Sequence, residues 1–309
     1  MGLVAASIGA LYTVFARWGV AHGLSSPDLT VLRFGVAGLI MLPVFALALR
    51  RDPAQFTSRW QVWLLVAFLA GTPFGLLMFG ALQFAPPSHA AVFPFTAMSL
   101  MGMVLGAVLL GDRMTLQRVV GIVIVLAGLV LVSGVEVSSL TLRASVGDAM
   151  FLAAGTLWAG FGIVLRKHRL DPLLATAVIS ISALLSYVPA YFWYTGGTSL
   201  FAADPYVFWV EVLVQGLIAG AGTLYSYSKM VSLLGPSRAA VFPALAPGLA
   251  ALMAWPVLGH VPALMETAGL VLVMAGLIVA VTSTTSNKSS TTEINASTVT
   301  STVISGIKS

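Results

Sequence analysis

The chain has 309 residues, of which 59% are hydrophobic and only 8% are charged, and it carries a formal net charge of +5. Soluble domains carry about 25% charged residues, so the composition excludes an ordinary soluble domain and indicates a protein of the lipid bilayer. The basic residues stand singly between apolar runs rather than in a patch, which argues against nucleic acid as a partner. Because the chain contains no cysteine, a disulfide framework and a thiolate metal site are excluded.

Ten apolar segments follow one another along the chain, and short joints with turn-forming residues separate them. A helix of roughly 20 apolar residues is long enough to cross about 30 Å of hydrocarbon. The segments cover about residues 2–21, 29–49, 61–83, 89–110, 116–134, 146–165, 173–194, 207–228, 238–258 and 264–282. The sequence therefore predicts an all-α membrane protein with ten transmembrane helices.

Lys and Arg gather in every second loop and in the tail, while the opposite side carries only Arg143 between its spans. Basic loops face the cytoplasm, so both termini are predicted to be cytoplasmic in a multi-pass protein of the cell (inner or plasma) membrane. Residues 283–309 are rich in Ser and Thr and lack apolar periodicity. Such a segment cannot bury enough apolar surface to fold, which predicts a disordered cytoplasmic tail.

The chain contains an internal duplication. Residues 87–94 read PSHAAVFP and residues 236–243 read PSRAAVFP. With five spans in each copy, the copies must insert in opposite directions, and the basic loops have changed sides accordingly: loop 2–3 is basic, whereas its counterpart, loop 7–8, is not. We therefore expect two inverted five-helix repeats, residues 1–137 and 138–282, a build typical of secondary transporters with a substrate site near the midplane. The alternative is a duplicated scaffold without a pathway.

Several short motifs occur in a fixed order along the two repeats. They are Leu32-Arg33-Phe34, Leu110-Gly111-Asp112-Arg113-Met114-Thr115 with Gly121 and Ala127-Gly128, and Leu233, Gly235 and Ser237-Arg238-Ala239. Because these motifs occur in this order, the chain resembles the drug/metabolite transporter superfamily, specifically its EamA-type members. The resemblance implies transport of amino acids, metabolites or drugs, usually outward, and no enzyme activity. The family's Trp-Gly and Glu-Pro are Ile8-Gly9 and Ala246-Pro247 here, so the resemblance does not name a substrate.

Charged residues are predicted to avoid the centres of the spans, and Asp148, Glu211 and Glu266 are placed near span ends. An ionisable group inside the membrane is a functional hypothesis by default, and a buried carboxylate is the usual element of proton coupling. Its absence favours a facilitator or exchanger of neutral or zwitterionic solutes. His89 and His260 near the outer face leave proton coupling open, because histidine titrates close to neutral pH.

Polar and aromatic side chains well inside the spans are the candidates for a substrate site. They are Tyr12, Thr72, Phe95, Thr96, Ser99, Trp158, Phe161, Gln215, Thr223 and Tyr227. Trp158 and Phe161 share one face of a helix and with Phe95 could stack on a ligand. Gln215 is the best single candidate, because an amide in hydrocarbon needs a partner. Ser and Thr can instead bond to carbonyls of their own helix, and aromatic rings can be plain packing.

Two arginines and two prolines are candidates for gating. Arg33, about one turn into the second span, either receives a substrate carboxylate or extends to the lipid headgroups. Arg238 lies beside a cytoplasmic turn, where it either guards the mouth or satisfies the bias of basic residues to that side. Pro94 and Pro243 occupy equivalent places in the repeats, where each is either a hinge for alternating access or a static kink.

The sequence also bears on helix packing, on a second substrate class and on enzyme activity. Gly121, Gly128, Gly269 and Gly276 predict close helix packing between the repeats, with a homodimer contact as the less favoured reading. An alternative substrate class, sugar phosphates or nucleotide sugars, would require cations deep in the cavity, whereas this chain is expected to keep its Arg and Lys at span ends. A membrane-embedded enzyme is the distant alternative, because no catalytic or metal-binding constellation is visible and no cofactor is implied.

Overall fold

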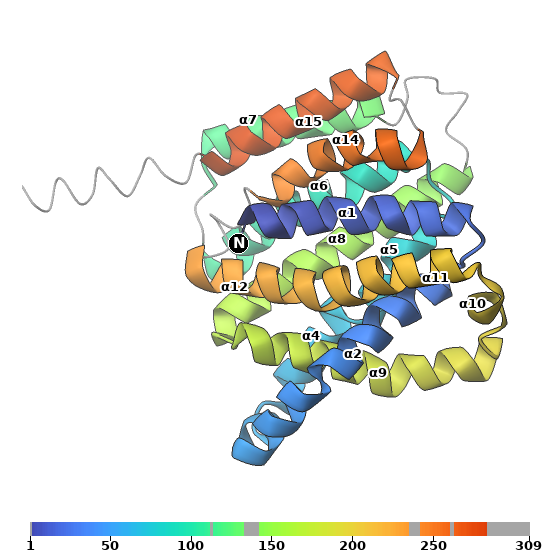
Figure 1. The fold of residues 1–309 in the computed structure, drawn as a ribbon. Coiled ribbons are helices and arrows are strands. Elements are labelled where there is room, and N and C mark those ends of the chain that lie inside the picture. The colour runs from blue at the N-terminus through green and yellow to red at the C-terminus, as the bar shows by residue number, and fades with distance from the viewer. Residues whose placement is uncertain (1, 112–113, 133–141, 235–241, 260–262, 283–309) are drawn as a thin grey trace, which may run out of the picture.

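The computed structural model describes residues 2–111, 114–132, 142–234, 242–259 and 263–282, and within them the regular structure is helical, without a strand. The helices lie side by side in one bundle (Figure 1). Each predicted apolar segment is helical over most of its described length. The all-α prediction is therefore confirmed, while the crossing of the membrane by ten helices stays a prediction.

Seven helical segments of the described chain are long and apolar enough to cross a membrane. They are α1 (Gly2–Ala21), α2 (Ser26–Arg51), α4 (Trp60–Ala70) with α5 (Thr72–Ala81), α6 (Pro87–Leu110), α8 (Leu142–His168), α9 (Pro172–Thr195), and α11 (Pro205–Glu211) with η2 (Val212–Thr223) and α12 (Leu224–Leu234). Three shorter apolar helices are α7 (Leu116–Val132), α14 (Ala246–Leu258) and α15 (Leu264–Thr282). Short turns form α3 (Ala54–Thr57), α10 (Thr198–Ala202) and the 3-10 turn η3 (Pro243–Leu245).

The third predicted span is divided. Its first part, α4, ends at Ala70, and α5 begins at Thr72 after Gly71. Pro73, at the start of α5, has no backbone N–H to donate and favours the first turn of a new helix. A proline in an apolar run therefore interrupts a helix that hydropathy alone would draw as continuous.

The second span begins three residues earlier than predicted, because its first turn is capped. Ser25 and Asp28 form a capping box, in which Asp28 Oδ2 accepts from the Ser25 backbone N at 2.7 Å. The other oxygen of Asp28 accepts from Ser199 Oγ at 2.9 Å and from the Tyr191 hydroxyl. This buried carboxylate thus joins the start of α2 to the end of α9.

Five helix pairs make the most extensive contacts between separate segments: α7 with α15, α6 with α8, α2 with α9, α1 with α14, and α2 with η2. The α7–α15 pair forms one edge of the bundle (Figure 1). A Cβ on Gly121 would lie 2.6 Å from that of Ala280, and one on Gly128 would lie 2.8 Å from the carbonyl oxygen of Gly269. The predicted use of these glycines for packing between the two halves is confirmed. Dimerisation stays a prediction.

Candidate functional site

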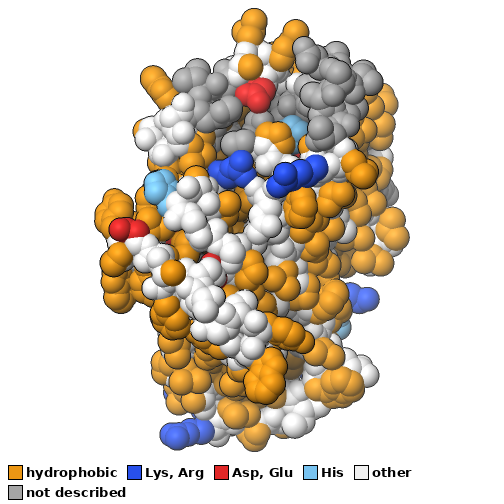
Figure 2. Space-filling model, turned by 90° about the vertical axis from the view of Figure 1, so that its right-hand side faces the viewer, with side chains coloured by type: hydrophobic (Ala, Val, Ile, Leu, Met, Phe, Trp, Pro, Cys, Tyr) orange, Lys and Arg blue, Asp and Glu red, His pale blue; other side chains and the backbone are white. Residues whose placement is uncertain are grey.

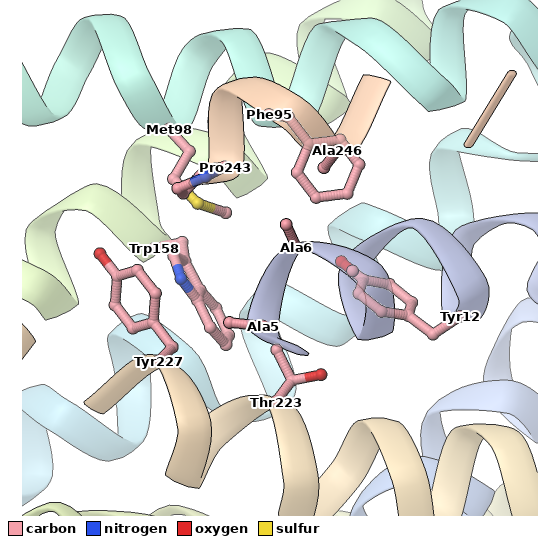
Figure 3. Close-up of a pocket in the computed structure, with 11 residues that line it drawn as sticks. Ala5, Ala6, Tyr12, Phe95, Met98, Trp158, Thr223, Tyr227, Pro243 and Ala246 are labelled. Atoms are coloured by element: carbon pink, nitrogen blue, oxygen red, sulfur yellow. The ribbon is translucent and has the colours of Figure 1, made fainter. Parts of the chain in front are cut away.

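A small cavity lies where α1, α6, α8, η2 with α12, and η3 with α14 meet (Figure 3). Its lining residues are Ala5, Ala6, Gly9, Tyr12, Phe95, Met98, Trp158, Thr223, Tyr227, Pro243 and Ala246. The centre of a water-sized sphere can move through about 30 Å³ of it. Pockets that bind organic ligands are usually about 300–1,000 Å³. A solute of amino-acid size therefore needs the surrounding helices to move apart before it can enter.

One wall of the cavity is aromatic. The ring of Trp158 lies 5.3 Å from Tyr227 and 4.7 Å from Phe74, measured between centroids, and the first two rings lie next to each other in Figure 3. Within the described residues, Nε1 of Trp158 and the hydroxyl of Thr223 are buried and have no hydrogen-bond partner. Buried polar groups normally have partners, so these two can bond to a ligand. The wall combines aromatic faces with two free polar groups.

Half of the predicted binding residues come together at this cavity. Those on its lining are Tyr12, Phe95, Trp158, Thr223 and Tyr227. They come from helices far apart in the sequence, and packing brings them within one small volume. Whether they bind a solute stays a prediction.

The other predicted binding residues lie outside the lining. Phe161 packs behind it, 5.7 Å from Trp158. Thr96 and Ser99 are buried on α6, and neither hydroxyl has a partner among the described residues. Thr72 begins α5. Gln215 donates from Nε2 to the carbonyl oxygen of Tyr12 at 2.9 Å, so it reaches the cavity only through the helix that carries Tyr12.

Sequence reasoning missed the small and flexible part of the lining, formed by Ala5, Ala6, Gly9, Met98 and Ala246. Such residues occur throughout the apolar helices, so composition gives no signal for them. Gly9 has a steric role, because a Cβ at this position would lie 3.1 Å from the ring of Phe95. The one available signal was Met98, which lies three residues after Phe95 and therefore on the same face of its helix.

Arg33 is fully buried, with 0% of its surface exposed. Its guanidinium lies 4.5 Å from the ring centroid of Tyr12, and none of its three nitrogens has a hydrogen-bond partner within the described chain. The alternative in which this side chain extends to the headgroups is therefore wrong, because Tyr12, Phe34 and Phe74 surround its head. The cation lies behind the Tyr12 wall of the cavity. Arg238 lies outside the described residues.

Glu211 corrects the expectation that no carboxylate is buried. It ends α11, its exposed fraction is 0%, and its two oxygens have no hydrogen-bond partner by geometry in the described chain. A Cβ on Gly19 would lie 2.7 Å from Glu211 Oε1, so α1 covers the carboxyl closely. The position of Glu211 near the end of its apolar run did not predict its burial. The carboxyl is enclosed by the neighbouring helix α1, and not because it lies deep along its own helix.

Asp148, another carboxyl near the outer end, has a partner. His89 Nδ1 lies 2.7 Å from Asp148 Oδ1 and thereby joins α6 to α8, and the imidazole stacks on Phe93 at 5.0 Å. His260 lies outside the described residues. Within the described ranges, no three His, Asp or Glu side chains gather in a way that could hold a metal ion.

The two hinge candidates differ in their surroundings. Pro94 lies inside the continuous helix α6, and α8 approaches it at Gly155, where a Cβ would be 2.6 Å from the Cβ of Ala97. Pro243 instead begins the short turn η3, ahead of α14. Residues 238–241, which precede Pro243 in the predicted span, lie outside the described residues, so the depth of Pro243 within its helix stays a prediction. A hinge role for either stays a prediction.

The end of the bundle at which α1 finishes has a basic depression, and Figure 2 looks onto this end. Its lining residues are Arg17, Val20, Ala21, Leu82, Gln83 and Arg143. Arg17 donates to the carbonyl oxygen of Leu82, and Arg143 Nη2 donates to that of Gln83 at 3.0 Å. Both cations therefore bind the end of the third predicted span, at the face predicted to lie outside the cell.

The chain matches the model of one transporter family and is similar to two proteins that are named as transporters. The model of the EamA-like transporter family matches residues 1–134 and, separately, residues 145–282. The chain is 23% identical to "Uncharacterized transporter YyaM" of Bacillus subtilis (strain 168) over 252 residues, covering 80% of this chain and 82% of that protein. It is 28% identical to "Uncharacterized transporter in sor 3'region" of Acidianus ambivalens over 211 residues, covering 65% and 72%. A solved crystal structure that is 18% identical superposes with a TM-score of 0.65, over 90% of this chain and 96% of the other.

Proposed function

Since this chain belongs to the EamA-like transporter family, we propose that it carries small neutral or zwitterionic organic solutes, such as amino acids and related metabolites, by alternating access. It is a multi-pass membrane transporter, and the solute class is our proposal. The supporting observation is the cavity in which Trp158 and Tyr227 present aromatic faces beside the free hydroxyl of Thr223. Outward flux is the direction that the resemblance implies.

We further propose that the chain crosses the membrane ten times in two inverted repeats. Arg17 and Ala21 near the end of α1 and Arg143 near the start of α8 line the same depression, so the first helices of the two halves run in opposite directions. Packing is also reciprocal, because α6 of the first half pairs with α8 and α14 of the second half pairs with α1. The cavity lies between the halves, where rocking of one half against the other would expose it to each side in turn.

Arg33 is the group we propose to receive the carboxylate of a zwitterionic solute. Its guanidinium has no polar partner in the described chain, and it lies 4.5 Å from the ring centroid of Tyr12, which lines the cavity. A planar guanidinium binds a carboxylate through two parallel hydrogen bonds. The lining itself contains no Lys or Arg among the described residues. A sugar phosphate carries more negative charge and would need several cations, so this alternative has less support.

Counterflow of labelled amino acids into proteoliposomes tests the solute class without requiring a driving force. Trp158→Ala should reduce counterflow up to about tenfold, because an aromatic contact contributes about 0.5–1.5 kcal/mol. The matched control is Trp193→Ala, since this residue is 87% exposed and lies far along α9. Equal counterflow in both variants would remove the aromatic wall from the pathway, and no counterflow of any amino acid in the wild type would reject the solute class.

The inverted insertion is tested with single cysteines in a chain that naturally has none. Ser58→Cys after α3 and Ala202→Cys at the end of α10 are exposed positions in loops 2–3 and 7–8. A membrane-impermeant maleimide added to intact cells should label Ala202→Cys and leave Ser58→Cys unlabelled until the cells are opened. Labelling of both from the same side would reject the inverted repeats.

A further inference from the structure

The carboxyl of Glu211 lies at the junction of two kinds of helix. It ends α11, and the following 12 residues, Val212–Thr223, form the π-helix η2. π-helical turns are rare and occur frequently at functional sites. The last residue of η2, Thr223, lines the cavity. One irregular segment therefore connects a buried acid directly to the proposed solute site.

The surroundings of this carboxyl suit a neutral acid better than an ion. The side chain is 0% exposed, and neither oxygen has a hydrogen-bond partner by geometry among the described residues. The backbone of α1 lies against it, because a Cβ on Gly19 would be 2.7 Å from Oε1. An ionised carboxylate buried without a charged partner is costly, and such a group takes up a proton instead.

The charged and titratable groups on the elements packed against α11 and η2 make their contacts elsewhere. On α1, Arg17 bonds to Leu82, His22 to Trp18, and the Tyr12 ring lies under Arg33 of α2. Asp28 of α2 bonds to Tyr191 and Ser199, and Tyr187 of α9 bonds to Pro27. On α11 and α12, Tyr206 packs on Trp18 and Tyr227 on Trp158, while Lys229 is six residues past the end of η2. Within the described chain, no ion pair includes Glu211.

A second route links the carboxyl to the cavity through α1. Gln215 lies one turn after Glu211, and its Nε2 donates to the carbonyl oxygen of Tyr12 at 2.9 Å. Tyr12 lines the cavity, and Gly19 on the same helix covers the carboxyl. A movement of α1 that opens the cavity would therefore also uncover Glu211.

We propose that Glu211 is the site at which this transporter binds and releases a proton in each cycle, so that a pH gradient drives solute flux. When α1 moves away on one side of the membrane, the carboxylate takes a proton from hydronium, so that an O–H bond of hydronium breaks and one forms on a carboxyl oxygen. The neutral acid is then covered by α1, and when it is uncovered toward the other side its O–H bond breaks and the proton returns to water. No electron is transferred and no other reactant is needed. This inference rests on the proposed alternating access to the cavity, and it replaces the facilitator that the sequence favoured.

The test separates exchange from driven transport in proteoliposomes that contain the full chain. Wild-type protein should accumulate a labelled amino acid when a pH gradient is imposed. Glu211→Gln, which cannot exchange a proton, should retain counterflow within about twofold and lose at least about tenfold of the gradient-driven accumulation. Glu266→Gln is the matched control, because this carboxyl lies in the first turn of α15 and is partly exposed. It should behave as wild type.

Results other than these decide whether Glu211 is the proton site. Accumulation that ignores the gradient in the wild type, or that persists in Glu211→Gln, overturns the proposal. The proposal is also overturned if His89→Gln loses gradient-driven transport while Glu211→Gln keeps it. If Glu211→Gln also loses counterflow, Glu211→Asp is used, and a shift in the pH of half-maximal driven transport supports the proposal while an unchanged profile rejects it.

A measurement without any solute keeps the two proposals distinguishable. Infrared difference spectra of the wild type at a series of pH values should contain a carboxylic-acid band that titrates and that Glu211→Gln removes. If no amino acid undergoes counterflow but this band is present, the solute class is wrong and the proton site stands. If counterflow is present and the band is absent, the proton site is wrong and the solute class stands.

Discussion

Asp148 and Glu211 are two carboxyl groups near the same end of the bundle, and they differ in what surrounds them. Asp148 lies between α8 and α6, 2.7 Å from the imidazole of His89. Glu211 lies between α11 and α1 and has no ion-pair partner in the described chain. The first carboxyl therefore has an evident structural use, holding two helices together. The second has none.

The difference matters because burial alone does not distinguish structural from functional charges. A paired carboxylate keeps its charge and stabilises the arrangement that pairs it, so it changes little as long as the helices stay together. A buried carboxyl without a charged partner is stable only in its neutral form. Its charge is then free to depend on whether α1 covers it, which is the property that a coupling site requires.

The largest effect is expected where the covering of Glu211 is disturbed. Gly19→Val should lower the free energy of unfolding by about 3 kcal/mol, because overpacking typically costs about 1–3 kcal/mol and a Cβ here would already lie 2.7 Å from the carboxyl oxygen. Thermal unfolding in detergent measures this. Gly102→Val is the control, since nothing lies within 4 Å of a Cβ at that glycine. Equal stability of the two variants would mean that the carboxyl can swing away from α1.

The same chemical change should affect the two carboxyls differently. Asp148→Asn removes the charge that His89 pairs with and should lower stability by about 1.5 kcal/mol, the lower end of the range for charged hydrogen bonds. Glu211→Gln should lower stability by less than Asp148→Asn does, because an amide replaces an acid that has no charged partner. Denaturant unfolding of both variants measures the contrast. A larger loss in Glu211→Gln than in Asp148→Asn would reverse the comparison.

A smaller effect on stability than that of Asp148→Asn is expected at the connection between Glu211 and the cavity. Gln215→Ala removes one hydrogen bond to Tyr12 and should lower stability by about 1 kcal/mol, while it reduces transport more strongly. Counterflow and thermal unfolding are measured side by side with Gln55→Ala, whose side chain lies on the short helix α3. Unchanged transport in Gln215→Ala would show that α1 is not coupled to η2 through this bond.

Much of the fold was predictable because it depends on properties that are local in the sequence. A run of about 20 apolar residues must form a helix in hydrocarbon, since every backbone group has to be paired within the segment. The glycines of α7 and α15 predicted close packing between the halves for a similarly simple reason, namely that they carry no side chain. The start of α2 was misplaced by three residues, because the capping box formed by Ser25 and Asp28 extends the helix beyond the apolar run.

The site was predictable only in part. Trp158, Tyr227 and Thr223 stood out as polar or aromatic groups inside apolar helices, and they line the cavity. Gln215 stood out as the best single candidate and yet bonds to the backbone of α1 instead. The sequence states which side chains need a partner, but not whether the protein or a ligand provides it.

The sequence by itself determined that this chain is a helical membrane protein with an internal duplication, because apolar length and repetition can be read directly along the chain. Only the tertiary structure decided that Arg33 and Glu211 are enclosed rather than near the membrane surface. A side chain is enclosed by the helix that packs across it. Over Glu211 that helix is α1 at Gly19, which lies almost 200 residues away in the chain.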